Sequence, residues 1–543
     1  MRKVFVDRSR VEDTLRCKRL RYLRYHQDST GIDGITKPLP LAVGGSVHVG
    51  LALLLREGQR LYDESSGKLY WSHVLEDNAV AAALADFSQH SSALELDTTE
   101  QSQMQPIAGA TTAEQLAESL GLSAAEAGID SLAQRVGHAQ EQFNSYLVAE
   151  QSALVEAMVR AYSRRRLRPL LEQFEVLEVE REGTWLLSEW MQPNGSGPEF
   201  GGWNTKTGAQ LWFMSRPDAL LRERSSNQLY LQSFKTAASW DIRKARDAEH
   251  DMQGLSEGVE IERRLGEWWE HLQWCKREKQ PFTFTISREF EQRPSETIAK
   301  FLLALPAPPR IHAIRYEYML KGDRWRDKEL SARLQLDCRS QRSHLVRCYE
   351  AVSVPARSQA FSVGDVCWSW DYTRVEDMRE SSLAWQNWKS RPVWERPGGI
   401  KAWIDRLDSA APLMSGEDST VGMEPRALGY QCDAQALGVT AVHPLDAVFI
   451  PPVVVYRNDD DLRDWMESTE WQEREVAEHI AEVEAAADEG ERRSLLNRYF
   501  SMNRHACIYP SQCQFVGVCY GGADIRRDPL ASGLFVKRTP NHP

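Results

Sequence analysis

The middle of the chain holds the feature that most constrains its fold. The apolar run Leu211–Met214 is followed closely by Pro217-Asp218. Polar turns come next, and a second strand-like run, Leu229–Phe234, leads directly into Lys235 before a helix-like segment begins. An acid and a lysine at the ends of two paired strands can place a divalent cation beside a phosphate group. This order therefore predicts a metal-dependent site that cleaves phosphodiester bonds.

The length and composition set the class of protein. With 543 residues, 42% of them hydrophobic, the chain can bury a large core in about two or three units. We expect a cytoplasmic protein with no membrane segment, because no apolar run approaches the roughly 20 residues of a membrane helix and the basic N-terminus lacks the apolar stretch of a signal peptide. The net charge of −12 is unlike that of a DNA-coating protein, so any DNA contact would use local basic patches. Nine cysteines are an odd number and argue against a disulfide framework.

Composition and periodicity divide the chain into five segments. Residues 1–86 form an N-terminal helical segment, residues 87–132 a Ser/Thr/Ala/Gln-rich surface insertion without Lys or Arg, and residues 133–325 the core. Residues 326–470 are a tryptophan-rich insertion to which the sequence assigns no chemistry. Residues 471–543 hold a charged helix and three cysteines.

Alternating apolar and polar residues predict about six strands between long helical stretches. The fold class is therefore α/β or α+β, with a mixed central sheet flanked by helices and with helical and irregular insertions. The predicted strands are Glu175–Glu180, Thr184–Met191, Leu211–Met214, Leu229–Phe234, Phe282–Ile286 and Ile311–Leu320.

Several short motifs together resemble a known family. They are Gly44-x-x-Val47-His48, Pro217-Asp218, Phe234-Lys235-Thr236 and Gln253. In this order they resemble the PD-(D/E)xK nuclease superfamily, and within it the RecB-type branch of CRISPR-associated and phage exonucleases. The resemblance covers roughly residues 10–60, 133–320 and 500–543 and implies a restriction-endonuclease-like core. It implies that His48 and Asp218 bind Mg²⁺ or Mn²⁺, that Lys235 orients the attacking water, and that Gln253 holds the end of the DNA.

Four cysteines match a second feature of that branch. Cys17 lies near the N-terminus, and Cys507, Cys513 and Cys519 lie near the C-terminus. The resemblance implies that they bind a [4Fe–4S] cluster, for which thiolates are the expected ligands. The spacing of the first two tail cysteines is wider than usual in the branch, so zinc held by four cysteines stays an alternative, as do three unpaired cysteines on a loop. A cluster here would tie the two ends of the chain together and be structural.

The motif departs from the family at one position. The superfamily has an acid two residues before the lysine, where this chain has Ser233. Three outcomes stay open. Glu249 supplies the carboxylate from the following helix, where it would share a face with Gln253; Ser233 and a water complete a weakened metal site; or the protein keeps the fold and the DNA groove and cuts nothing. Glu180 is a further carboxylate that could position the site from its strand.

The leading hypothesis is a DNA exonuclease that acts on single strands or duplex ends at a single Mg²⁺ or Mn²⁺ site. Helicase, recombination or CRISPR proteins are the partners that the resemblance implies, and the chain itself has no Walker motif. A non-enzymatic nucleic-acid-binding or assembly protein is the alternative, and a cysteine-bound zinc scaffold is a third. Arginines suit phosphate contacts, and those predicted to bind DNA are Arg16, Arg19, Arg21, Arg164 and Arg165.

Overall fold

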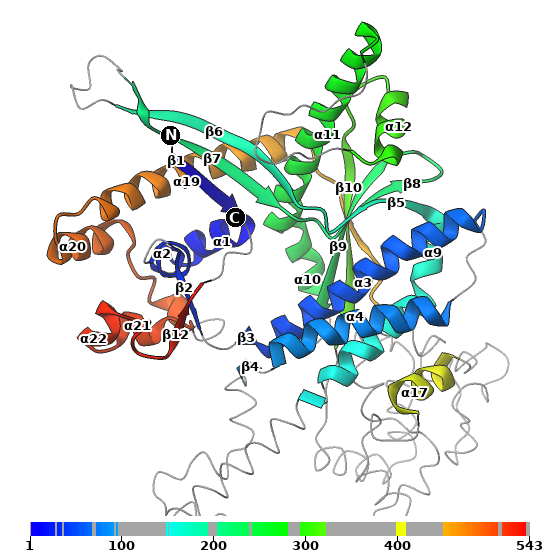
Figure 1. The fold of residues 1–543 in the computed structure, drawn as a ribbon, viewed down its shortest axis with the longest axis horizontal. Coiled ribbons are helices and arrows are strands. Elements are labelled where there is room, and N and C mark those ends of the chain that lie inside the picture. The colour runs from blue at the N-terminus through cyan, green and yellow to red at the C-terminus, as the bar shows by residue number, and fades with distance from the viewer. Residues whose placement is uncertain are drawn as a thin grey trace, which may run out of the picture.

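The computed structural model has helices on both sides of a central sheet and a smaller helical region where the two chain ends meet (Figure 1). It describes residues 2–27, 30–34, 37–67, 72–91, 94–95, 148–149, 151–193, 203–237, 242–280, 294–321, 398–408, 449–508 and 513–538.

The central sheet has five strands in the order β11-β10-β9-β8-β5. Strands β5, β8 and β9 pair antiparallel, β10 runs parallel to β9, and β11 pairs antiparallel with β10. The parallel β9–β10 pair requires a long crossover, which helices α10, α11 and α12 provide. The bounds are β5 Phe174–Val179, β8 Ala219–Glu223, β9 Leu229–Ala237, β10 Ile311–Leu320, β11 Val453–Val455, α10 Ile242–Glu249, α11 Met252–Glu278 and α12 Glu296–Ala304.

Two groups of helices cover the sheet. Helix α3 (Leu39–Glu64) packs against α4 (His73–Ser91), α9 (Leu167–Gln173) and β5, while α11 packs against α12, β9 and β10. Alternation along β9 turns Leu231 toward α11, where it joins a buried cluster with Leu220 of β8 and Ile261 and Leu265 of α11. By length and composition alone α3 could cross a membrane from Leu41 onward, contrary to the expectation from the sequence, although here it packs as a core helix does.

A second sheet has the strand order β1-β7-β6, with β1 parallel to β7 and β6 antiparallel to it. Strand β1 spans Arg2–Asp7, β6 Gly183–Pro193 and β7 Trp203–Ser215. Its core includes Phe213, which packs edge-on against Trp465 with ring centroids 5.3 Å apart. The predicted run Leu211–Met214 therefore lies in this sheet and does not pair with the strand of Lys235. The partner of β9 is β8, which the sequence analysis took for polar turns because its five residues include Arg222 and Glu223.

The two ends of the chain pack together. Helices α1 (Arg8–Arg16) and α2 (Lys18–Tyr25) lie beside the C-terminal elements, and β2 (Ile32–Gly34) pairs antiparallel with β12 (Phe535–Lys537). Arg21 and Glu473 form an ion pair of 2.7 Å in which both side chains are 0% exposed. The C-terminal elements are α19 (Asp459–Glu484), α20 (Glu489–Tyr499), the short 3₁₀ helix η5 (His505–Cys507), α21 (Val516–Tyr520) and α22 (Ala523–Arg527).

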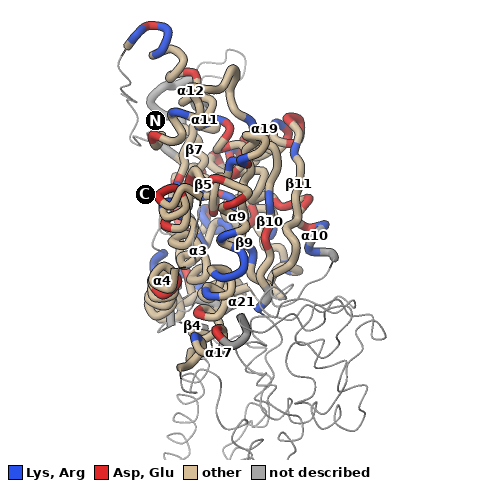
Figure 2. The backbone as a smooth tube through the Cα atoms, turned by 90° about the vertical axis from the view of Figure 1, so that its right-hand side faces the viewer, with Lys and Arg blue, Asp and Glu red and all other residues tan. Residues whose placement is uncertain are grey.

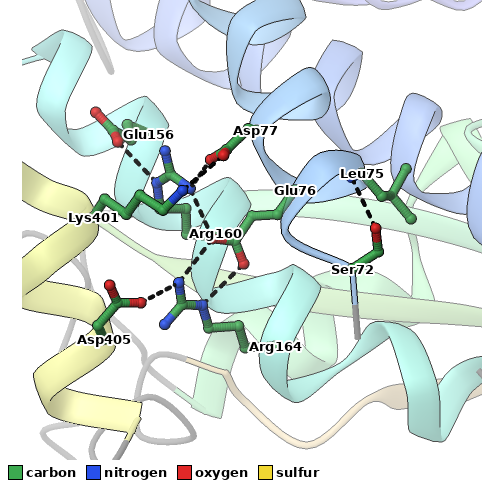
Figure 3. Close-up of polar contacts among 9 residues, drawn as sticks. All are labelled: Ser72, Leu75, Glu76, Asp77, Glu156, Arg160, Arg164, Lys401 and Asp405. Atoms are coloured by element: carbon green, nitrogen blue, oxygen red, sulfur yellow. Dashed lines mark hydrogen bonds and ion pairs between the residues drawn. The ribbon is translucent and has the colours of Figure 1, made fainter. Parts of the chain in front are cut away.

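One helix from the tryptophan-rich segment docks on the core. Helix α17 (Gly399–Asp408) places Lys401 2.7 Å from Asp77 and Asp405 2.7 Å from Arg164 (Figure 3). Arg160, from a helix over residues 151–165, also bonds Asp77 at 2.7 Å. This ion-pair network joins α17 to α4 and to that helix. In the view of Figure 2, acidic and basic residues are interspersed along the elements.

The mixed α and β architecture predicted from the sequence is confirmed. Five of the six predicted strands coincide with β5, β6, β7, β9 and β10. The sixth, Phe282–Ile286, and most of the 87–132 and 326–470 insertions lie outside the described residues. The remaining two-stranded pair is β3 (Lys37–Pro38) with β4 (Leu94–Glu95).

Candidate metal centre

Three side chains from distant parts of the chain meet at one end of the central sheet. His48 comes from α3, Glu180 follows β5, and Asp218 precedes β8. One ligand atom from each lies within 4.8 Å of the other two, and within the described residues this is the group of His, Cys, Asp and Glu side chains close enough to hold a metal ion. One imidazole and two carboxylates form a donor set that suits Mn²⁺ or Mg²⁺.

The backbone brings the two carboxylates together. Glu180 has a left-handed backbone with φ 49°, which is uncommon outside glycine, and its N–H donates to the Asp218 carbonyl at 3.1 Å. This bond joins the end of β5 to the start of β8. As a result both carboxylates face the same space at the sheet end.

Asp218 is held in place by two hydrogen bonds. The backbone N–H of Phe234 in β9 donates to its Oδ2 at 2.6 Å, and His48 Nδ1 lies 3.1 Å from its Oδ1. Burial works against the charged form, but His48, the Phe234 N–H and Lys235 together hold the pKa of Asp218 below its usual range. The carboxylate is therefore ionised and available as a ligand at neutral pH.

The neighbouring groups respond to the Asp218 charge. Burial lowers the pKa of His48, yet Asp218 and Glu180 outweigh burial and raise it. Burial and then Asp218 raise the pKa of Glu180 to about 6, although Arg216 lies 3.1 Å away. Two carboxylates this close repel each other when both are charged. A bound cation would relieve that repulsion.

Lys235 and Gln253 form a second part of the site. Lys235 Nζ donates to Gln253 Oε1 and lies 3.0 Å from Asp251. Arg8 of α1 donates to the same Gln253 oxygen at 2.6 Å. On the other side of the amide, Gln253 Nε2 donates to Glu257 Oε1 at 2.8 Å. The sequence analysis missed Glu257 as a site residue. Its spacing of four residues from Gln253, one helical turn, was the available indication.

The structure brings together His48 with Asp218, and Lys235 with Gln253, as expected. The prediction for Glu249 is wrong in its premise. Helix α10 ends at Glu249 and α11 begins at Met252, so Glu249 and Gln253 do not share a helix face, and Glu249 is exposed. Asp251 caps α11 by accepting from the Gln253 N–H at 3.0 Å. Ser233 is buried, and its Oγ has no hydrogen-bond partner in the described part of the chain.

The four cysteines of the predicted cluster lie in one region. Cys17 belongs to a hydrophobic cluster against which Cys513 and Cys519 pack, and the Cys513 N–H donates to the Cys507 carbonyl at 2.9 Å. The backbone of Asn503 touches two of the sulfurs: its N–H lies 3.4 Å from Cys17 Sγ, and its carbonyl lies 3.6 Å from Cys507 Sγ. These four described thiols contain no trio of sulfurs within 4.8 Å of one another.

Three of the five arginines predicted to bind DNA are used inside the protein. Arg21 is buried against Glu473, and the Arg164 side chain is 2% exposed and bonded to Glu76 and Asp405. The Arg19 guanidinium donates to the carbonyls of Phe500 and Leu496 at 2.8 and 3.1 Å. The DNA-binding prediction is wrong for Arg21 and Arg164, because their charges are buried against carboxylates. It stays a prediction for Arg16, Arg19 and Arg165.

Comparison with protein-family models and with curated proteins found no match to this chain.

Proposed function

We propose that the chain is a metal-dependent DNA nuclease, an exonuclease that hydrolyses phosphodiester bonds with one Mg²⁺ or Mn²⁺ ion. The observation that carries the proposal is the meeting of His48, Glu180 and Asp218 within 4.8 Å. The order of elements also supports the family resemblance. Helix α3, the antiparallel run β5-β8-β9, helix α11 and the parallel strand β10 follow one another as in a restriction-endonuclease-like core.

A bound cation would polarise a phosphoryl oxygen and lower the pKa of the attacking water. The residues of the chain would do the rest. His48, Glu180 and Asp218 hold the cation, and Lys235 orients the water and stabilises the negative charge that develops on the phosphate. Arg8 and Gln253, which bond to each other beside Lys235, are placed to grip the DNA backbone.

Incubation with end-labelled single- and double-stranded DNA and Mn²⁺ tests the proposal. The wild-type protein should shorten the labelled strands from their ends, whereas the Lys235→Ala and Asp218→Asn variants should leave them intact. Glu249→Ala is the matched control, since it removes an exposed carboxylate of the neighbouring helix and should cut like the wild type. Cleavage that survives Lys235→Ala would remove this site from consideration.

The alternative is a protein that binds nucleic acid with this fold and cuts nothing. Ser233, in the place of the usual motif acid, favours it, because one fewer carboxylate weakens cation binding. Under this alternative the wild type would bind DNA ends without shortening them, and Mn²⁺ would not change the result.

For the four thiols we propose an iron–sulfur cluster. The family resemblance and the packing of Cys17, Cys513 and Cys519 in one hydrophobic cluster support this proposal. The Asn503 N–H beside Cys17 is the kind of donor that stabilises cluster thiolates. A brown protein with iron and sulfide would support this proposal, and a colourless one with zinc would overturn it.

A further inference from the structure

Glu257 is a buried carboxylate with one oxygen unaccounted for. It lies on α11, one helical turn after Gln253, and is 5% exposed. Its Oε1 accepts from Gln253 Nε2 at 2.8 Å, but its Oε2 is buried and has no hydrogen-bond partner among the residues described. A buried carboxylate oxygen without a partner is costly. A bound ligand from outside the chain would supply the partner that this oxygen lacks among the described residues.

Ser233 faces the same helix. Ala219 pairs with Gln232 in the antiparallel β8–β9 register, so one residue further along Asp218 lies level with Ser233. Alternation puts Ser233 on the same side of β9 as Leu231, which packs against Ile261 and Leu265 of α11. The Ser233 Oγ is also buried, with no hydrogen-bond partner in the part of the chain that the structure describes. An acid at position 233 would thus point into the space between Asp218 and α11.

Glu257 approaches that space from the opposite wall. Burial raises the pKa of Glu257 well above its usual range, the charge of Asp218 raises it further, and Lys235 lowers it. Gln253 links Glu257 to Lys235 through its two amide ends. The buried, unpaired oxygen of Glu257 therefore belongs to the same site as the metal-binding group, although it lies outside the 4.8 Å trio of His48, Glu180 and Asp218.

We propose that Glu257 supplies the carboxylate that is missing at Ser233 and binds, from α11, the cation held by His48, Glu180 and Asp218. Gln253, which donates to the other oxygen of Glu257, would orient that carboxylate. This inference rests on the proposed function, because it names a further ligand of the same metal centre.

Binding of Mn²⁺ to the full-length protein, followed by isothermal titration calorimetry, tests the inference without a cleavage assay. Glu257→Gln should raise the dissociation constant by at least about tenfold, toward a hundredfold. Glu249→Gln, the control on the neighbouring helix, should leave it unchanged. Restoring the motif acid in the double variant Ser233→Glu, Glu257→Gln should recover most of the lost affinity. Should Glu257→Gln fail to fold, Glu257→Asp keeps the charge, withdraws the carboxylate by one methylene, and should still weaken binding.

Wild-type affinity in Glu257→Gln, or in a folded Glu257→Asp where Glu257→Gln does not fold, would overturn the inference. The proposed function fails separately. A wild-type protein that binds Mn²⁺ through Glu257 but never cuts DNA would leave the ligand assignment standing and refute the nuclease. If cleavage requires Asp218 and Lys235 but substitution of Glu257 leaves Mn²⁺ affinity unchanged, the nuclease proposal stands and the Glu257 ligand assignment is refuted.

Discussion

The buried Arg21–Glu473 pair gives the sharpest prediction on how the two chain ends are held. Both side chains are 0% exposed, and the pair joins α2 to α19. The pair is also incomplete: in the described structure Arg21 Nε and Nη1 and Glu473 Oε1 have no hydrogen-bond partner. Removing one partner should therefore be costly, because it leaves a buried charge, while removing both should not.

The cost of Arg21→Met follows from the protonation of Glu473. Burial raises the pKa of Glu473, and Arg21 is the main group that lowers it. Without Arg21 the carboxyl stays protonated in the folded protein, whereas in the unfolded chain its pKa is about 4.3. At about 1.36 kcal/mol per pKa unit, the loss of stability is at most about 3.7 kcal/mol at pH 7 and about 1 kcal/mol at pH 5. Both values are upper limits, because Arg10 also lowers the pKa of Glu473 and because burial keeps that pKa raised even beside Arg21.

The sign follows from proton binding. The folded variant holds one proton more than its unfolded state above pH 4.3, so its stability falls as pH rises. Hydrogen-exchange mass spectrometry of peptides from α2 and α19 measures the local opening free energy at each pH. The double variant Arg21→Met, Glu473→Met should stay within about 1 kcal/mol of the wild type. Arg60→Met, which removes exposed ion pairs with Glu57 and Glu64, should leave the opening free energy unchanged. A pH-independent loss in Arg21→Met, or a double variant as unstable as the single one, would refute the reasoning.

Three further predictions concern the other charged and thiol groups. Mn²⁺ affinity should rise from pH 5 to pH 7 in calorimetric titrations, because Glu180 and His48 must lose protons to bind a cation. The pKa of Glu180 is raised to about 6, and that of His48 is also raised. A flat or falling profile would contradict the site. Arg160→Met removes one of the two arginines that form ion pairs with the fully buried Glu76, so α4 should lose about 2 to 3 kcal/mol of local stability by hydrogen exchange. Unchanged protection would count against the network. Cys17→Ser should lower the iron bound per protein while Cys275→Ser does not, and equal iron content in both would argue against the cluster.

Much of the candidate site could be predicted from the sequence, because its elements carry local patterns. A polar residue at the end of an apolar run stands out, and this placed Asp218 and Lys235. The ligand role of His48 was expected only because Gly44-x-x-Val47-His48 resembles a motif of the nuclease family. The prediction that Glu249 supplies the missing carboxylate failed because helical spacing cannot reveal the break between α10 and α11. Asp251 caps the new helix that begins after this break.

The partners of β9 were decided only by the tertiary structure. Strand β8 is five residues long and two of them are charged, so its alternation is too short to detect. Its pairing is decided by contacts between Leu220, Leu231 and α11. The role of arginines was likewise hidden, since a basic helix looks the same whether its charges face solvent or, as for Arg21, a buried glutamate.

The sequence by itself determined which side chains the chain offers and the mixed helix and strand composition, because hydrophobic period and residue chemistry are local properties. Tertiary structure alone decided which distant groups meet. Glu180, Arg8 and Glu257 reach the site only because a left-handed turn, a helix at the chain end and one turn of α11 converge there. Such convergence depends on the packing of segments far apart in the chain, which no local pattern records.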